Sequence, residues 1–151
     1  MRETVRDLAR VARGGQSTAA DAARAVTELA LARIRHALTP VRNLPLGGCG
    51  PKQQLTAAQQ AVVSRVRYVV PRVGRRVPWR SDCLVQALAA RRWLAKSGID
   101  SAIRIGGRIN SGGAFEAHAW LTAGDTIVTG WDIDRFAEFA AFPLDQAWPG
   151  R

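Results

Sequence analysis

The chain has 151 residues, 47% of them hydrophobic and 23% charged, which fits one compact domain with a core and excludes general disorder. It contains no run of about 18 uncharged apolar residues, so no membrane span is predicted. The first residues mix acidic and basic side chains without the apolar stretch of a secretory signal, and a cytoplasmic location is expected. The formal net charge of +10 favours an anionic partner.

Residues 1–55 are predicted to form a helical N-terminal extension that ends in a glycine- and proline-rich loop. Hydrophobic residues recur at helical spacing over Ser17–Leu38, and Ser17 or Thr18 can cap this helix. Thr39–Pro51 then changes to a composition typical of a loop or linker. The main domain is therefore predicted to cover residues 56–151.

Two further helices are predicted ahead of the strands. Thr56-Ala-Ala-Gln59 is a capping box for a helix that is expected to run through Val70 and to stop before Pro71. The next helix is expected over Cys83–Lys96, with Asp82 as its cap.

Beyond these helices the hydrophobic pattern alternates, as it does in strands. Three strands are predicted: Ala102–Gly106, which Arg108 could extend, Phe115–Thr122 and Thr126–Gly130. A short helix is expected from Asp134 to Phe139. Helices followed by an antiparallel meander predict the α+β fold class.

Cys83 is the first residue that points to chemistry. Its expected position in the first turn of a helix would place backbone amides and the helix dipole where they favour the thiolate and can hold an oxyanion. The alternative is an ordinary core cysteine that packs beside Leu84 and Leu88.

A cysteine nucleophile needs a general base, and the chain contains two histidines. His36 is expected on the N-terminal helix, whereas His118 lies in the middle of a predicted strand. Asp132 follows the next strand and could orient the imidazole, with Asp134 as the alternative third residue. The competing interpretation of His118 is a half-buried structural histidine.

No metal site or cofactor is predicted. Two cysteines and two histidines lack the clustered spacing of zinc ligands. The glycine-rich stretch from Gly47 to Lys52 has neither the preceding strand nor the Lys-Ser/Thr ending of a phosphate-binding loop.

Arginines crowd the segment ahead of Cys83, at positions 65, 67, 72, 75, 76 and 80. They could be solvated helix faces, a surface for an acidic peptide or partner, or, less in keeping with the sequence, a nucleic-acid surface, since aromatic residues do not interleave with them. Trp79, Trp131, Arg76 and Arg80 are the candidate substrate-binding residues.

Several motifs together resemble one family. They are Cys83-Leu84, Lys96-Ser-Gly-Ile99, Ile103-Arg-Ile-Gly106 and Ala117-His-Ala-Trp120. In order and spacing they resemble the transglutaminase-like leader peptidases of lasso-peptide biosynthesis, and the likeness covers roughly Val62–Phe139.

The resemblance implies a papain- or transglutaminase-like cysteine protease domain over residues 56–151, in which the helix that begins at Cys83 packs on a small antiparallel sheet. It implies a Cys83–His118–Asp132 triad that removes the leader from a lasso-peptide precursor. It also implies two partners, a small separate leader-binding protein and a cyclase resembling asparagine synthetase. The alternative function is a non-catalytic basic adaptor of the same fold that binds a peptide or nucleic acid.

Overall fold

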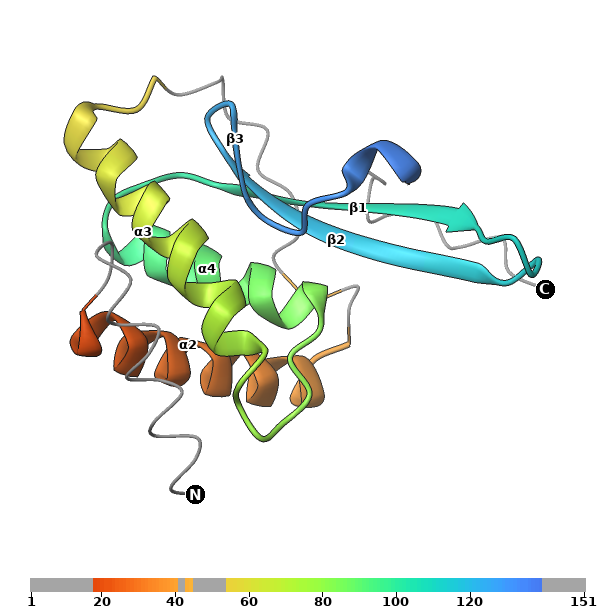
Figure 1. Cartoon of the computed structure of the whole chain (residues 1–151), viewed down its shortest axis with the longest axis horizontal. Coiled ribbons are helices and arrows are strands. Elements are labelled where there is room, and N and C mark those ends of the chain that lie inside the picture. The colour runs from red at the N-terminus through yellow and green to blue at the C-terminus, as the bar shows by residue number, and fades with distance from the viewer. Residues whose placement is uncertain (1–17, 41–42, 45–53, 140–151) are drawn as a thin grey trace.

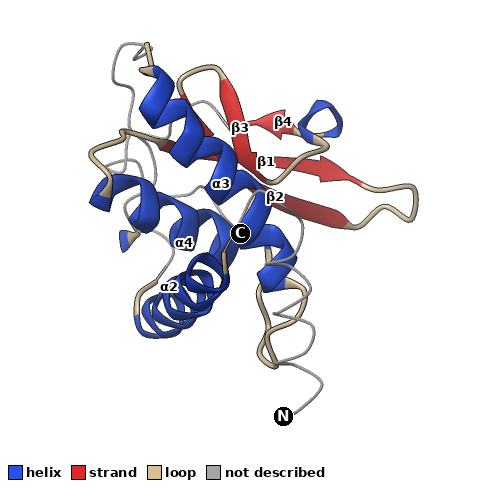
Figure 2. Cartoon of the chain, turned by 60° about the vertical axis from the view of Figure 1, so that its left-hand side comes forward, coloured by secondary structure: helices blue, strands red, loops and turns tan. Residues whose placement is uncertain are grey.

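The computed structural model describes residues 18–40, 43–44 and 54–139 of the chain. Within these residues three α-helices gather on one side of a four-stranded antiparallel sheet (Figures 1 and 2). The helices are α2 (Ala19–Leu38), α3 (Ala57–Gly74) and α4 (Cys83–Lys96). The predicted α+β class is confirmed. None of the described helices is long and apolar enough to cross a membrane.

Local side-chain contacts explain where α2 and α3 begin. Thr18 accepts a hydrogen bond from the amide of Asp21, and the Asp21 carboxylate accepts one from the amide of Thr18 at 2.9 Å. Thr56 and Gln59 form the same reciprocal pair at the start of α3. Each capping box satisfies two amides that a helix end otherwise leaves without partners, so both predicted helix starts are confirmed.

The predicted end of α3 before Pro71 is wrong, because the helix continues through it to Gly74. Proline removes one backbone hydrogen bond, but the Arg75 amide donates to the Pro71 carbonyl at 3.2 Å and closes one more turn. Pro71 and Val73 are both buried. Burial of these apolar side chains in the last turn offsets the lost hydrogen bond.

The sheet has the strand order β3-β2-β1-β4. Its strands are β1 (Ala102–Ile109), β2 (Phe115–Ala123), β3 (Thr126–Thr129) and β4 (Ala137–Glu138). The three predicted strands are confirmed, although β1 extends beyond its predicted end. The helix predicted over Asp134–Phe139 is wrong: a 3₁₀ helix covers Ile133–Arg135, and β4 then pairs with Gly106 and Gly107 of β1.

Helix α4 occupies the centre of the fold, because it contacts both other helices and strands β1, β2 and β3 (Figure 1). Trp93 and Leu94 of α4 are buried with Val69 of α3 and Leu121 of β2. A fully buried side chain of this kind stabilises the fold by about 1.5–3 kcal/mol. The start of α4, where Cys83 lies, is thus held in place by the hydrophobic core.

A buried ion pair joins α2 to α4. Glu28 is almost fully buried, and its carboxylate accepts hydrogen bonds from Arg92 at 2.9 Å and Lys96 at 2.6 Å. Burial acts to raise the pKa of Glu28, but the hydrogen bonds from Lys96 and Arg92 outweigh it and leave the pKa below its ordinary value. Helix α2 therefore belongs to the same packed unit as the helix that carries Cys83, while the predicted boundary between residues 55 and 56 stays a prediction.

Candidate active site

Cys83 is the first residue of α4 and carries a free, partly exposed thiol. Asp82 caps the helix: its carboxylate accepts from the Val85 amide at 3.1 Å, and its carbonyl accepts from the Gln86 amide. The amides of Cys83 and Leu84 form no hydrogen bond with any described residue. Two amides beside the sulfur are therefore left to bind a ligand oxygen.

His118 lies on β2 and contacts two aromatic rings. Its imidazole stacks on Phe136, with ring centroids 4.8 Å apart, and more distantly on Trp120. Its Nε2 atom lies 3.1 Å from the carbonyl oxygen of Gly130. A carbonyl oxygen can only accept, so Nε2 carries the proton in this hydrogen bond. In the neutral ring Nδ1 is then the atom that can accept a proton.

Gly130 can approach β2 closely because it lacks a side chain. Its φ is +77°, a left-handed conformation that favours glycine. A Cβ atom here would lie 2.5 Å from the Ala119 carbonyl oxygen and 2.8 Å from the Trp120 Cα atom. Only glycine fits this position without movement of the β2 backbone, which places the Gly130 carbonyl against His118.

Neither candidate carboxylate is hydrogen-bonded or ion-paired to His118 within the described part of the chain. The Asp132 side chain is 64% exposed and forms an ion pair with Arg135 at 3.5 Å. Asp134 is exposed in the 3₁₀ helix. Asp132 also has a left-handed φ of +79°, which is uncommon outside glycine. Helix α4 and strand β2, which carry Cys83 and His118, do contact one another.

The sequence model of the transglutaminase-like superfamily matches residues 25–141, well over half of the chain. The chain belongs to the transglutaminase-like superfamily. A search of curated proteins and a search of solved structures give no match. Membership agrees with the fold class predicted from the sequence, and the superfamily commonly includes cysteine proteases.

Three of the predicted substrate-binding residues make local contacts. Trp79 is partly buried and packs against the hydrophobic core. Arg76, in the turn after α3, donates to the carbonyl of Arg72 at 2.7 Å. Arg80 is 82% exposed, and its guanidinium lies 3.9 Å from Asp82. Their proposed substrate contacts stay predictions.

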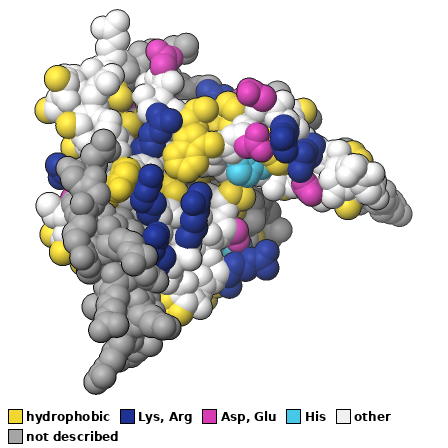
Figure 3. Space-filling view, in the orientation of Figure 1, with side chains coloured by type: hydrophobic (Ala, Val, Ile, Leu, Met, Phe, Trp, Pro, Cys, Tyr) yellow, Lys and Arg dark blue, Asp and Glu magenta, His cyan; other side chains and the backbone are white. Residues whose placement is uncertain are grey.

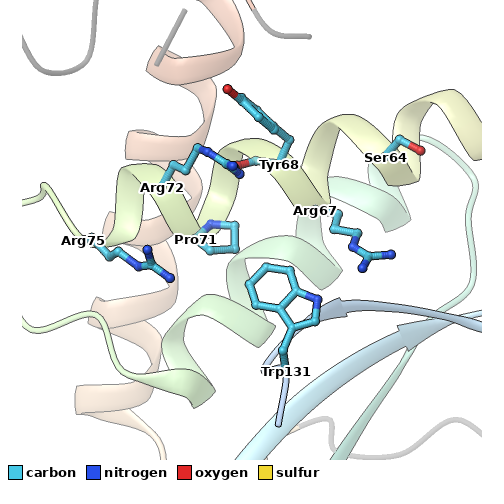
Figure 4. Close-up of a pocket in the computed structure, with 7 residues that line it drawn as sticks. All are labelled: Ser64, Arg67, Tyr68, Pro71, Arg72, Arg75 and Trp131. Carbon is cyan, nitrogen blue, oxygen red and sulfur yellow. The ribbon is translucent and has the colours of Figure 1, made fainter. Parts of the chain in front are cut away.

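The fourth, Trp131, lines a pocket of about 490 Å³ that α3 forms on this transglutaminase-like domain (Figure 4). The other lining residues come from α3 and its C-cap: Ser64, Arg67, Tyr68, Pro71, Arg72 and Arg75. In Figure 3 lysine and arginine side chains gather beside a hydrophobic patch, and a histidine lies at another edge of that patch.

These arginines belong to the basic run ahead of Cys83, but Arg67, Arg72 and Arg75 were not among the predicted site residues. Part of the signal was present in the spacing, since Arg72 and Arg75 are three residues apart and such residues share one face of a helix. Arg72 and Arg75 were not placed on the helix, because it was expected to end before Pro71. Gly130 was also missed as the hydrogen-bond partner of His118, because a backbone carbonyl leaves no signature in side-chain type.

Proposed function

We propose that this transglutaminase-like protein is a cysteine peptidase in which Cys83 is the nucleophile and His118 the general base. The observation that carries the proposal is the hydrogen bond between His118 Nε2 and the Gly130 carbonyl. It fixes the tautomer in which Nδ1 is the proton acceptor, as a base for a thiol requires. The position of Cys83 at the start of α4 supplies the second requirement, amides that can stabilise an oxyanion.

In the proposed reaction His118 Nδ1 takes the proton from the Cys83 sulfur, and the thiolate attacks the carbonyl carbon of a peptide bond. The amides of Cys83 and Leu84 donate to the oxyanion of the tetrahedral intermediate. The imidazolium then gives its proton to the leaving amine, and a thioester remains on Cys83. Water, activated by the same imidazole, hydrolyses the thioester and restores both groups.

Gly130 would act on this reaction through His118. When the imidazole is protonated, its Nε2–H group still donates to the Gly130 carbonyl, whose partial negative charge stabilises the cation. A Cys83–His118–Asp132 triad, or one completed by Asp134, remains part of the proposal, and either aspartate would need to turn from solvent toward the imidazole.

The proposed substrate is the precursor of a lasso peptide, from which the enzyme removes the leader. Support comes from the motif around His118, Ala117-His-Ala-Trp120, and from the other motifs that resemble this group of peptidases. A separate leader-binding protein and a cyclase resembling asparagine synthetase would be its partners. The net charge of +10 would favour an acidic leader or partner.

The test is mass spectrometry of a candidate precursor after incubation with the wild type and with Cys83→Ala, His118→Ala, Asp132→Ala and Asp134→Ala, each with a leader-binding protein present. We expect cleavage at one bond by the wild type and none by the Cys83 and His118 variants. The aspartate variant that loses more activity identifies the third residue, and two fully active aspartate variants would leave the Gly130 carbonyl in that role. Unchanged cleavage by Cys83→Ala would refute Cys83 as the nucleophile, and no cleavage by any of these proteins, wild type included, would favour a non-catalytic basic adaptor.

A measurement without substrate complements this test. Iodoacetamide should alkylate Cys83 faster than Cys49, which lies outside the described residues, near neutral pH. The preference should decrease in His118→Ala if the imidazole takes the thiol proton. Equal rates for the two cysteines in the folded wild type would contradict the assignment of Cys83 as a nucleophile.

A further inference from the structure

We infer that the pocket on α3 is a binding site for an acidic side chain of a peptide, next to the Cys83–His118 site. The peptide is taken to be a substrate, so this inference rests on the proposed peptidase function. The chemical class of the ligand, a carboxylate on a peptide, follows from the lining of the pocket itself.

The pocket combines three cations with an apolar wall. Arg67 and Arg72 lie on α3 and Arg75 is its C-cap residue, and Pro71 and Trp131 lie between Arg67 and Arg75 (Figure 4). None of the seven lining residues is acidic. A volume of about 490 Å³ accommodates one or two side chains rather than a folded partner.

The charge of these arginines is not neutralised within the described residues, where no carboxylate forms an ion pair with any of the three. The Arg67 guanidinium lies over the Trp131 ring at 5.9 Å from its centroid, and that of Arg72 lies over Tyr68 at 3.7 Å. Contact with aromatic faces orients a guanidinium without cancelling its charge. The pocket is therefore electropositive, which favours an anion.

The pocket is also joined to the proposed catalytic site by the chain itself. Trp131 follows Gly130, whose carbonyl is hydrogen-bonded to His118. Consecutive Cα atoms are about 3.8 Å apart, so Trp131, which forms a wall of the pocket, directly follows the residue whose carbonyl is hydrogen-bonded to the imidazole. A peptide bound across the site would place a side chain in this pocket within a few residues of the bond to be cut.

An acidic peptide fits these residues better than a nucleic acid does. Single-stranded nucleic acid uses a groove in which successive bases stack on exposed aromatic rings. Here Tyr68 is partly buried beneath Arg72, so Trp131, 37% exposed, presents the larger free ring. A single pocket lined by three arginines instead suits a carboxylate, which the planar guanidinium fork binds through paired hydrogen bonds.

The test measures binding by fluorescence anisotropy at low salt, on full-length Cys83→Ala protein so that no cleavage occurs. The probe is a short fluorescein-labelled peptide with two adjacent glutamates, compared with the same peptide carrying glutamines. Arg67→Ala and Arg75→Ala are the test variants. Arg65→Ala is the matched control, because Arg65 lies on the same helix but forms its ion pair with Asp21 at 3.7 Å, outside the pocket.

We expect the glutamate peptide to bind at least about fivefold more tightly than the glutamine peptide, and each test variant to lose about three- to tenfold in affinity. The Arg65 variant should stay within about twofold of the parent protein. Circular dichroism on all variants checks that these exposed substitutions leave the fold intact.

Three results would overturn the inference. Equal affinity for the two peptides would show that the pocket does not recognise carboxylates. Equal loss in the Arg65 variant would show that diffuse charge, and not the pocket, attracts the peptide. Tighter binding of an oligothymidylate that depends on Arg67 and Arg75 would assign the pocket to nucleic acid. Because the assay needs no catalysis, failure of the peptidase proposal in the cleavage test would be seen separately.

Discussion

Gly130→Ala should destabilise the protein more than Gly98→Ala, although both glycines have a positive φ, +77° and +67°. Alanine in this conformation costs about 1–2 kcal/mol. Alanine also lowers the conformational entropy of the unfolded chain relative to glycine, which stabilises both variants by about 0.4–1 kcal/mol. At Gly98 a Cβ atom would meet nothing within 4 Å, so this variant should lose only the difference of these two terms, about 0–1.6 kcal/mol, in its free energy of unfolding.

At Gly130 the Cβ atom would instead meet the backbone of β2, at 2.5 Å from the Ala119 carbonyl oxygen. Backbone atoms of a paired strand cannot turn aside as a side chain can, so overpacking should cost about 1–3 kcal/mol more. Urea denaturation of wild type, Gly130→Ala and Gly98→Ala measures the difference directly. Equal losses in the two variants would refute the close approach of Gly130 to β2.

The same pair of variants tests the role of the Gly130 carbonyl. Displacement of this carbonyl should weaken its hydrogen bond to His118 and alter the pH dependence of Cys83 alkylation, whereas Gly98→Ala should keep the wild-type profile. A Gly130→Ala protein that is destabilised but retains the wild-type profile would show that the carbonyl does not position the histidine.

Three further predictions concern stability and reactivity. Glu28→Gln should lower the free energy of unfolding at pH 7 by about 1–3 kcal/mol in urea denaturation, below the usual cost of breaking a buried pair because its two cationic partners can turn to solvent. Because folding lowers the pKa of Glu28, its ionised carboxylate stabilises the folded protein fully above its ordinary pKa of 4.5, and this stabilisation is lost as the pH falls toward the folded-state pKa. A difference in the free energy of unfolding between wild type and Glu28→Gln that stays constant down to pH 3 would contradict this. Asp82→Asn keeps an acceptor for the Val85 amide but removes a negative charge beside Cys83, so alkylation of Cys83 should accelerate several-fold. The free energy of unfolding should change by less than about 0.5 kcal/mol in Asp82→Asn, whereas Asp82→Ala, which loses the cap, should lose about 1 kcal/mol.

Features that depend on neighbours in the sequence could be predicted from it. The Thr56–Gln59 capping box and the Asp82 cap involve contacts over three residues, so residue type alone located the starts of α3 and α4. Alternation likewise located β2, the strand that carries His118. These contacts form whatever the rest of the chain does, and local sequence therefore decides them.

Features that depend on distant packing could not be predicted in the same way. Pro71 remains helical because its side chain is buried against other elements, and β4 exists because Ala137 and Glu138 pair with a strand about thirty residues earlier. In the candidate site, residue type indicated Cys83 and His118, but the Gly130 carbonyl and its left-handed backbone become visible only when β3 is placed beside β2.

The short segment after β3 links the two parts of the proposed site. Gly130 holds His118, and the next residue, Trp131, forms a wall of the arginine-lined pocket. An acidic side chain bound beside Trp131 would restrict this segment and so hold the Gly130 carbonyl against the imidazole. We therefore expect loss of Arg67 to lower kcat as well as raise KM for an acidic substrate, because the pocket would contribute to the position of the base and not to binding alone. An unchanged kcat with a raised KM would show that the pocket binds peptide without influence on His118.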